Sequence, residues 1–183
     1  KKNYKYDILS VGRLVEQKGY DFLIKVAKKL YDKGLSFSLT IVGEGPQRSK
    51  LESMIKEYKL TEVVKLIGFR DNPFPYIDLA DLFVVSSRWE AMCMVLVEAM
   101  SRGCKVISTD CPYGPSEVLE NGKYGILVKN QNIEAMSQGI IKSLNKNSLI
   151  TPDMLKSRSL DFSIEKISNS YIEFFASIIP TEK

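Results

Sequence analysis

The sequence predicts an α/β fold in which helices flank one parallel β-sheet. Short apolar segments of strand-like composition alternate with segments whose apolar residues recur at helical spacing, which is typical of repeated βα units. The chain has 183 residues, of which 44% are hydrophobic, so it can bury one sizeable core. We therefore expect one α/β domain over residues 1–145 and a C-terminal helical extension over residues 146–183 that packs on it.

Six segments have the length and the β-branched or aromatic content of buried strands. They cover residues 6–11, 37–42, 63–67, 81–86, 104–108 and 125–128. Segments with helical periodicity alternate with them along the chain. We therefore expect the strands to pair in parallel through crossover connections.

Helical segments separate these strands. The first helix is expected over about residues 18–32, where the apolar side chains share one face and Gly34 ends the helix. The next covers residues 46–58 and begins with Pro46, which is tolerated in a first turn. Further helices are expected over residues 76–80, 94–103, 132–144 with Asn132 as the cap, 154–159 and 163–178. The last helix carries an apolar stripe that predicts core packing: Ile164, Ile167, Tyr171, Phe174, Phe175 and Ile179.

Composition excludes several classes of function. Lysine and arginine outnumber acidic residues by 26 to 22 and are scattered, so no nucleic-acid partner is expected. The chain has no signal peptide and no apolar run near the roughly 18 residues of a membrane span, so a cytoplasmic protein is expected. With three cysteines and no histidine, we expect reduced thiols, no histidine-dependent nucleophile and no bound metal or other cofactor. The chain has no initiator methionine and enters a predicted strand within a few residues, so we expect a piece of a larger protein; the alternative is a processed full protein.

The first strand leads into a loop with two cations. Gly12 permits a sharp exit, and Arg13 and Lys18 follow it, with Lys18 at a helix start. Helix N-termini favour anions, and arginine and lysine there suit a phosphate-bearing ligand. The alternative is a solvated loop with two ordinary surface cations.

The second and third strand exits are less specific. Gly43 and Gly45 flank Glu44 and allow a close approach of another chain segment or a ligand, although a tight turn before a helix is the simpler interpretation. The segment 68–70 offers a turn and Arg70, which suits either the flank of a nucleotide base or an ordinary surface position. The second exit is neither a GxGxxG nor a Walker loop. The first exit does not read GxGxxG either, which argues against a nicotinamide-dependent oxidoreductase.

The fourth exit carries two carboxylates. Glu90 follows the strand, and Glu98 lies in the next helix among apolar residues. Backbone N–H groups of the first turn of that helix are suited to hold a diphosphate together with Arg13 and Lys18. Glu90 is placed to accept hydrogen bonds from hydroxyl groups. Glu98 suits either the two vicinal hydroxyls of a ribose or an ion pair at the helix surface.

Five motifs in this order carry a resemblance. They are Gly12-Arg13 with Lys18-Gly19; Gly43-Glu44-Gly45-Pro46; Gly68-Phe69; Glu90 and Glu98 followed by Ala99-Met100 and Gly103; and Pro115-Ser116-Glu117 with Gly122 and Gly125-Ile126-Leu127-Val128. In order and spacing the sequence resembles the retaining glycosyltransferases of family four, over residues 7–144. The match is to the C-terminal, donor-binding domain, a Rossmann-like half of the GT-B fold, followed by that family's closing helices.

The resemblance implies a role for each of these residues. Arg13 and Lys18 would hold the diphosphate of a nucleotide sugar, Glu90 would bind the transferred sugar and Glu98 the ribose. Gly12 belongs to the same donor site, the Arg70 region would flank the base, and the backbone of Met92, Cys93, Met94 and Val95 would contact sugar and phosphate. No metal is implied, because cations and the helix stabilise the leaving diphosphate.

The resemblance also implies partners, and the sequence departs from the family at one place. The partners would be an N-terminal acceptor-binding domain and a glycan or lipid-linked acceptor for surface polysaccharide, with a UDP-sugar as donor and peripheral association of the full enzyme at the inner face of the membrane. The family usually has small or flexible residues after the first glutamate, where this sequence has Ala91-Met92-Cys93. That departure leaves open a non-catalytic nucleotide-binding or interaction module with the same fold.

Overall fold

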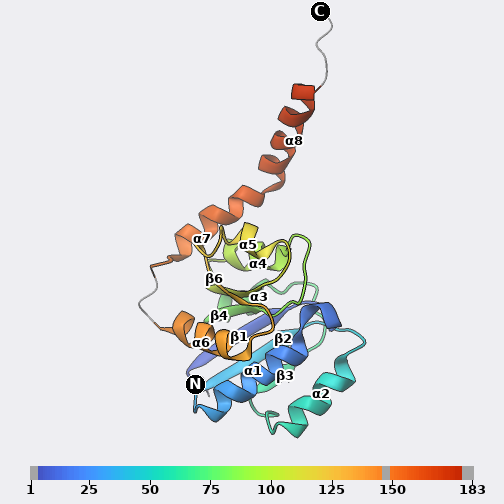
Figure 1. The fold of residues 1–183 in the computed structure, drawn as a ribbon, viewed down its shortest axis with the longest axis vertical. Helices are drawn as coiled ribbons and strands as arrows, with labels where there is room; N and C mark the ends of the chain where they lie inside the picture. The colour runs from blue at the N-terminus through green and yellow to red at the C-terminus, as the bar shows by residue number, and fades with distance from the viewer. Residues whose placement is uncertain (1–3, 146–148, 179–183) are drawn as a thin grey trace, which may run out of the picture.

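The computed structural model describes residues 4–145 and 149–178 and shows one parallel six-stranded sheet (Figure 1). The strand order in space is β3-β2-β1-β4-β5-β6. The strands are β1 (Tyr6–Val11), β2 (Phe37–Val42), β3 (Val64–Leu66), β4 (Leu82–Val85), β5 (Val106–Asp110) and β6 (Ile126–Lys129). The fold is Rossmann-like, which confirms the predicted class.

The centre of the sheet is the place where the direction of winding reverses. β1 pairs with β2 along its whole length, from Tyr6 opposite Phe37 to Val11 opposite Val42. On its other side β1 pairs with β4. The first half of the chain therefore extends the sheet from β1 to β3, and the second half extends it in the opposite direction, from β4 to β6. Ligands of open parallel sheets bind at such a reversal, beyond the carboxyl ends of the strands.

Helices cover both faces of the sheet, and each face has its own core (Figure 1). One face is covered by α1 (Tyr20–Asp32), α2 (Arg48–Glu57) and α6 (Ile133–Leu144). The other is covered by α3 (Phe74–Leu79), α4 (Met94–Ser101), α5 (Pro115–Val118) and α7 (Pro152–Ser159). Neighbouring strand residues alternate between the two cores, as Ile8 and Leu9 do in β1.

Differences from the predicted bounds have local causes. The first helix begins at Tyr20 because Glu16–Lys18 form a separate 3₁₀ turn and Gly19 adopts a left-handed backbone with φ of 63°. The other shifts are of one or two residues at each end. The short helix α5 was not predicted, since its four residues are too few to show a helical period. The Asn132 cap is confirmed, because its side-chain oxygen accepts a hydrogen bond from the Ala135 N–H at 2.9 Å.

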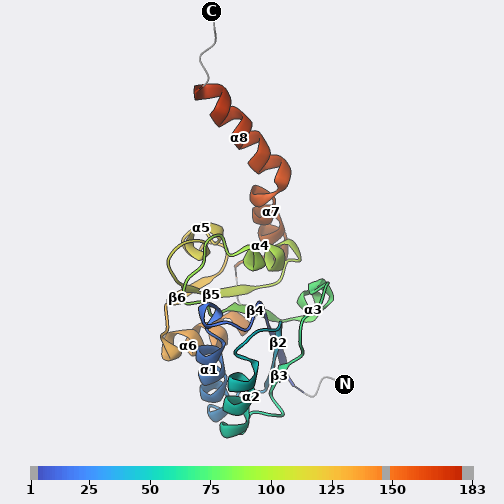
Figure 2. The ribbon, with the colours of Figure 1, turned by 90° about the vertical axis from the view of Figure 1, so that its right-hand side faces the viewer.

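The two last helices behave differently. α7 packs on the domain: Leu155 is buried, and the helix lies against α4 beside Gly103. α8 (Ile164–Ile178) has no buried residue and extends away from the sheet layers (Figure 2). The apolar stripe in α8 is therefore not part of this core, and Ile179 lies outside the described residues. The prediction of core packing was wrong for α8 because periodicity identifies an apolar face but not the surface that covers it.

Candidate functional site at the carboxyl ends of β1 and β4

The loop after β1 lies in close backbone contact with the exits of the neighbouring strands, β2 on one side and β4 on the other. Gly43 donates to the Gly68 carbonyl at 2.9 Å, and a Cβ at Gly43 would lie 1.9 Å from the Gly12 oxygen. Gly43 therefore allows a close approach between two chain segments, which is more than the tight turn that was the simpler interpretation. On the other side, a Cβ at Gly19 would lie 2.2 Å from the Ser86 carbonyl oxygen, at the exit of β4.

Lys18 is predicted to hold the diphosphate of a donor and Glu90 to bind its sugar, and the two side chains contact each other. Lys18 Nζ donates to Glu90 Oε1 at 2.6 Å, and Ser87 Oγ donates to the same oxygen at 2.5 Å. Glu90 is buried, with 9% of its surface exposed, so these two donors replace hydrogen bonds that the carboxylate would otherwise make with water. Thr109 Oγ1 in turn donates to the Ser87 carbonyl at 2.6 Å. No pattern in the sequence points to Ser87 and Thr109, because their role depends on tertiary contacts.

Arg88 fixes the loop that carries Glu90. Its guanidinium donates to both Asp21 oxygens, at 2.9 and 2.8 Å, and to the Glu16 carbonyl at 2.7 Å. Burial raises the pKa of Asp21, but the hydrogen bond and charge of Arg88, together with the hydrogen bond from the Phe22 N–H and the charge of Lys50, outweigh burial and hold that pKa below its usual value. The Arg88 N–H donates to the Gln17 carbonyl at 2.7 Å.

Trp89 lies in this fixed loop, next to Glu90. Its carbonyl accepts a hydrogen bond from Gln17 Nε2 at 3.0 Å, while its indole is half-exposed. The Arg88 carbonyl accepts another from Asn130 Nδ2, after β6, at 2.8 Å. The loop is thus tied to the exits of both β1 and β6.

The helix α4 presents its first turn to the same place. Cys93, its cap residue, has a left-handed backbone with φ of 57° and is buried. Burial raises the pKa of its thiol to about 12, so the thiol is protonated at neutral pH and is a poor nucleophile. Met94 is exposed, and Val95 lines a narrow pocket with Lys18 and Ser87 between the carboxyl ends of β1 and β4. The cation and the helix start therefore share one rim of the sheet.

Glu98 is half-buried and unpaired. Within residues 4–145 and 149–178, its carboxylate makes no hydrogen bond or ion pair with another side chain. Burial raises the pKa of Glu98, as expected for a carboxyl without a compensating partner. The alternative of a surface ion pair is therefore not what the structure shows, and the carboxylate is available to a ligand.

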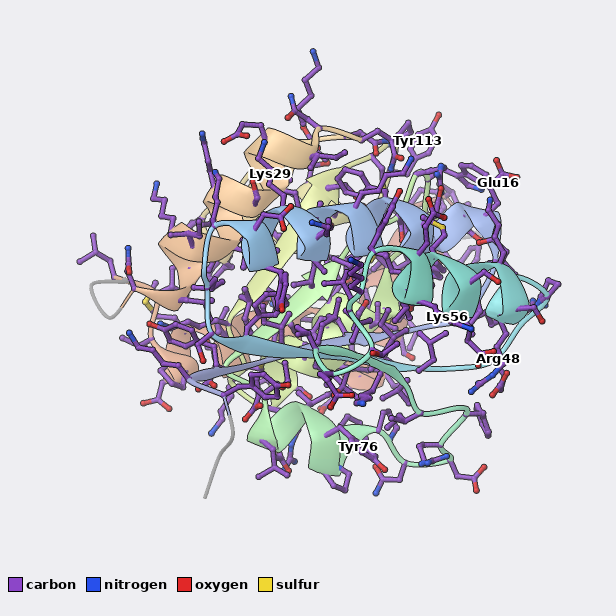
Figure 3. The ribbon with its side chains drawn as sticks, turned by 90° about the horizontal axis from the view of Figure 1, so that it is seen from below. Glu16, Lys29, Arg48, Lys56, Tyr76 and Tyr113 are labelled. Carbon is purple, nitrogen blue, oxygen red and sulfur yellow. The ribbon has the colours of Figure 1, made fainter. Side chains whose placement is uncertain are left out.

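The two predicted arginines occupy different surroundings. Arg13 follows Gly12 and is exposed, and its side chain makes no hydrogen bond or ion pair within the described part of the chain. Arg70 lies at the exit of β3, where its Nε donates to Tyr76 Oη at 3.1 Å. Figure 3 shows Tyr76 across the sheet from α1, whereas Glu16 and Tyr113 lie toward one end of the molecule. No contact within the described residues joins Arg70 to the Lys18–Glu90 pair.

A separate cavity lies away from this site. It measures about 720 Å³ and is lined by residues at the amino ends of β5 and β6, including Val106 and Ile126. We assign the site by the convergence of charged groups at the carboxyl ends of the strands, because that is where ligands of this sheet type bind.

Comparisons with known proteins identify the family. Residues 1–159 match the family model for glycosyl transferases group 1, and the chain belongs to that family. It is 33% identical to an uncharacterised glycosyltransferase of Methanocaldococcus jannaschii, over 87% of this chain and 47% of the relative. It is 32% identical to the N-acetylgalactosamine-N,N'-diacetylbacillosaminyl-diphospho-undecaprenol 4-alpha-N-acetylgalactosaminyltransferase of Campylobacter jejuni, over 91% of this chain and 46% of the relative. The chain thus spans about half the length of these relatives.

Solved structures show the same fold. Staphylococcus aureus TarM, crystallised with fondaparinux, α-GlcNAc-glycerol and UDP, matches with a TM-score of 0.83 and 28% identity, over 96% of this chain and 36% of TarM. A glycosyltransferase from Rickettsia africae matches with a TM-score of 0.86 and 20% identity, over 100% of this chain and 50% of that one. In the described part of this chain, no helix combines the length and apolarity that crossing a membrane requires.

Proposed function

We propose that this chain is the donor-binding half of a retaining glycosyltransferase that uses a nucleotide sugar, with UDP as the nucleotide. The donated group would be a hexose or N-acetylhexosamine, and the acceptor a glycan or lipid-linked glycan of a surface polysaccharide. The observation that carries the proposal is the contact of Lys18 with Glu90 beside the first turn of α4, at the reversal point of the sheet. The UDP bound to TarM and the acceptor named for the Campylobacter relative support the donor and acceptor classes.

The proposed chemistry is electrostatic stabilisation of a leaving diphosphate. Negative charge develops on the diphosphate as the bond to the sugar breaks, and Lys18 and Arg13 are cations at that edge of the sheet. The first N–H groups of α4 have no partner within the helix and favour an anion in front of them. These groups supply positive potential without a metal ion, so we propose a metal-independent transfer.

The remaining groups would hold the neutral parts of the donor. Glu98 carries an unpaired carboxylate that suits the two hydroxyls of a ribose, and Glu90 offers its second oxygen to a sugar hydroxyl. Arg70 would flank the base from the exit of β3. Gly12 leaves space at the base of the site, because a Cβ there would lie 2.9 Å from the Tyr20 hydroxyl oxygen.

Calorimetric titration of the chain with UDP, GDP and ADP tests this proposal. We expect binding with a preference for UDP. A preference for another nucleotide would keep the class of reaction and change the donor, whereas no heat with any of the three would refute the assignment of a nucleotide site.

Glu98→Gln is expected to stabilise the chain at neutral pH. Because burial raises the pKa of this carboxyl, the folded chain holds the proton more readily than the unfolded chain. The destabilisation from the charged form is therefore complete above the raised pKa, and it disappears as the pH falls below the ordinary carboxyl value. Urea unfolding should show an advantage for Glu98→Gln at pH 7 that shrinks at about pH 4.

The same variant should bind UDP more weakly, since a neutral amide accepts poorly from two hydroxyls. Glu57→Gln is the matched control, because Glu57 is an exposed residue at the end of α2. A Glu98→Gln chain that binds UDP as tightly as the wild type would exclude Glu98 from the ribose site.

We further propose that the N-terminal half of the complete enzyme covers the apolar face of α8. Seven large apolar side chains of this helix are exposed: Ile164, Ile167, Tyr171, Ile172, Phe174, Phe175 and Ile178. An exposed patch of this kind marks an interaction surface. Of its charged residues, Glu165, Lys166 and Glu173, only one is basic, which does not favour an anionic lipid surface.

Ending the chain after Ser163 is expected to reduce binding of a hydrophobic dye and concentration-dependent association. The free energy of unfolding of the α/β domain should stay unchanged, because α8 buries none of its side chains on that domain. Sedimentation velocity, dye fluorescence and urea unfolding measure the three quantities. A loss of several kcal/mol in unfolding free energy would show that α8 packs on this domain after all.

A further inference from the structure

Two consecutive serines at the exit of β4 each contact one partner of the ion pair between Lys18 and Glu90. Ser86 Oγ donates to the Lys18 carbonyl at 2.8 Å, and Ser87 Oγ donates to Glu90 Oε1 at 2.5 Å. Successive side chains of an extended segment point to opposite sides, so one serine reaches the β1 loop and the other reaches the carboxylate. Both serines are buried, with 1% of each exposed.

We infer that Ser87 is a positioning residue that selects which oxygen of Glu90 faces the sugar of the donor. This inference rests on the proposed function, because it assigns a part to Ser87 within the same site. Ser87 itself is anchored on its far side, where its carbonyl accepts the hydrogen bond from Thr109 at 2.6 Å.

The hydrogen bonds of Glu90 are unequally divided between its two oxygens. Oε1 accepts from both Lys18 and Ser87, whereas Oε2 makes no hydrogen bond within the described part of the chain. Oε2 is not among the side-chain atoms that are fully buried without a hydrogen-bond partner. An ionised carboxylate can accept about two hydrogen bonds at each oxygen, so a ligand hydroxyl is directed to Oε2.

Oε1 also connects the sugar end of the site to the phosphate end. Lys18 has three N–H donors and gives one to Oε1, so the others remain for an anion. Without the Ser87 hydroxyl, only Lys18 would orient the carboxylate, which could then rotate and direct both oxygens at the ammonium group. We therefore expect loss of Ser87 to weaken contacts to the sugar and to leave contacts to the nucleotide unchanged.

The test compares affinities for UDP and for UDP-N-acetylglucosamine in the full 183-residue chain. In Ser87→Ala, we expect affinity for the sugar nucleotide to fall about tenfold, as for one lost hydrogen bond to a charged group, while affinity for UDP is unchanged. Ser87→Thr keeps the hydroxyl and should restore most of the difference. Ser137→Ala is the matched control, since Ser137 is fully buried in α6 and donates to the Glu134 carbonyl.

Three outcomes would overturn the inference. Equal weakening of both ligands would show a structural role only, and unchanged affinity for both would show no role. A wild-type chain that binds UDP-N-acetylglucosamine no more tightly than UDP would also overturn it, because no sugar contact would then exist to be positioned.

A ligand-free measurement separates this inference from the proposed function. If the wild type binds no nucleotide, the proposed function fails. A double-mutant cycle of Ser87→Ala and Glu90→Gln in urea unfolding still tests the positioning, because the two effects should then be clearly non-additive. Additive effects would refute the positioning of Glu90 by Ser87.

Discussion

Lys18→Met in the complete enzyme is expected to lower kcat by about 10²–10³-fold, the cost of removing one group that stabilises charge in a transition state. Methionine keeps the length and the apolar stem of the side chain but removes the ammonium group. The effect should fall on kcat more than on KM, because in the proposed mechanism the diphosphate gains charge as the sugar leaves. Steady-state kinetics with the donor that calorimetry selects would measure it.

A second consequence of Lys18→Met concerns stability. The substitution leaves the buried Glu90 with Ser87 as its one remaining donor, so the free energy of unfolding should also fall. Lys25→Met is the control, because Lys25 is an exposed lysine of α1 outside the site. Normal turnover in both Lys18→Met and Arg13→Ala would remove these cations from the mechanism.

Gly19→Ala is expected to lower the free energy of unfolding by about 3 kcal/mol or more. Two effects add at this position. Alanine is strained in the left-handed backbone of Gly19, and its Cβ would lie 2.2 Å from the Ser86 carbonyl oxygen. The clash can be relieved only by separating the β1 loop from the exit of β4. Donor binding should therefore be lost together with stability, as urea unfolding and calorimetry would show.

Gly34→Ala distinguishes the two effects. Gly34 also has a left-handed backbone, with φ of 74°, but a Cβ there would meet nothing within 4 Å. We therefore expect a loss of only about 1 kcal/mol, from backbone strain alone, with no change in donor binding. Equal losses at Gly19 and Gly34 would show that the contact between the two loops contributes nothing.

The sheet was predictable because its strands are buried on both faces. The apolar runs of β1 and β2 end at Gly12 and Gly43, and their predicted bounds agree with the structure. The short helix α5 has too few residues to show a period. The exposure of α8 was not predictable, since amphipathic spacing gives the direction of a face and not the presence of a neighbour.

The convergence of the candidate residues was predictable, but their contacts were not. Glycines, cations and carboxylates that follow strands were expected at one edge of the sheet, because the carboxyl ends of parallel strands meet there. The pairing of Lys18 with Glu90 joins residues from two separate βα units. The ties from Arg88 to Asp21 and from Ser87 to Glu90 depend on side-chain orientation. Their residue types alone are compatible with an ordinary surface.

Trp89 is the one tryptophan of the sequence. The chain therefore carries an intrinsic fluorophore in the loop that presents Glu90, and no label is needed to follow that loop optically. The emission maximum of an indole depends on its exposure to water. A donor that excludes water from the neighbouring rim would therefore shift the maximum to shorter wavelength. Stopped-flow fluorescence could then measure the rate of nucleotide binding and the rate of a later step, in which the sugar contacts form, as separate phases.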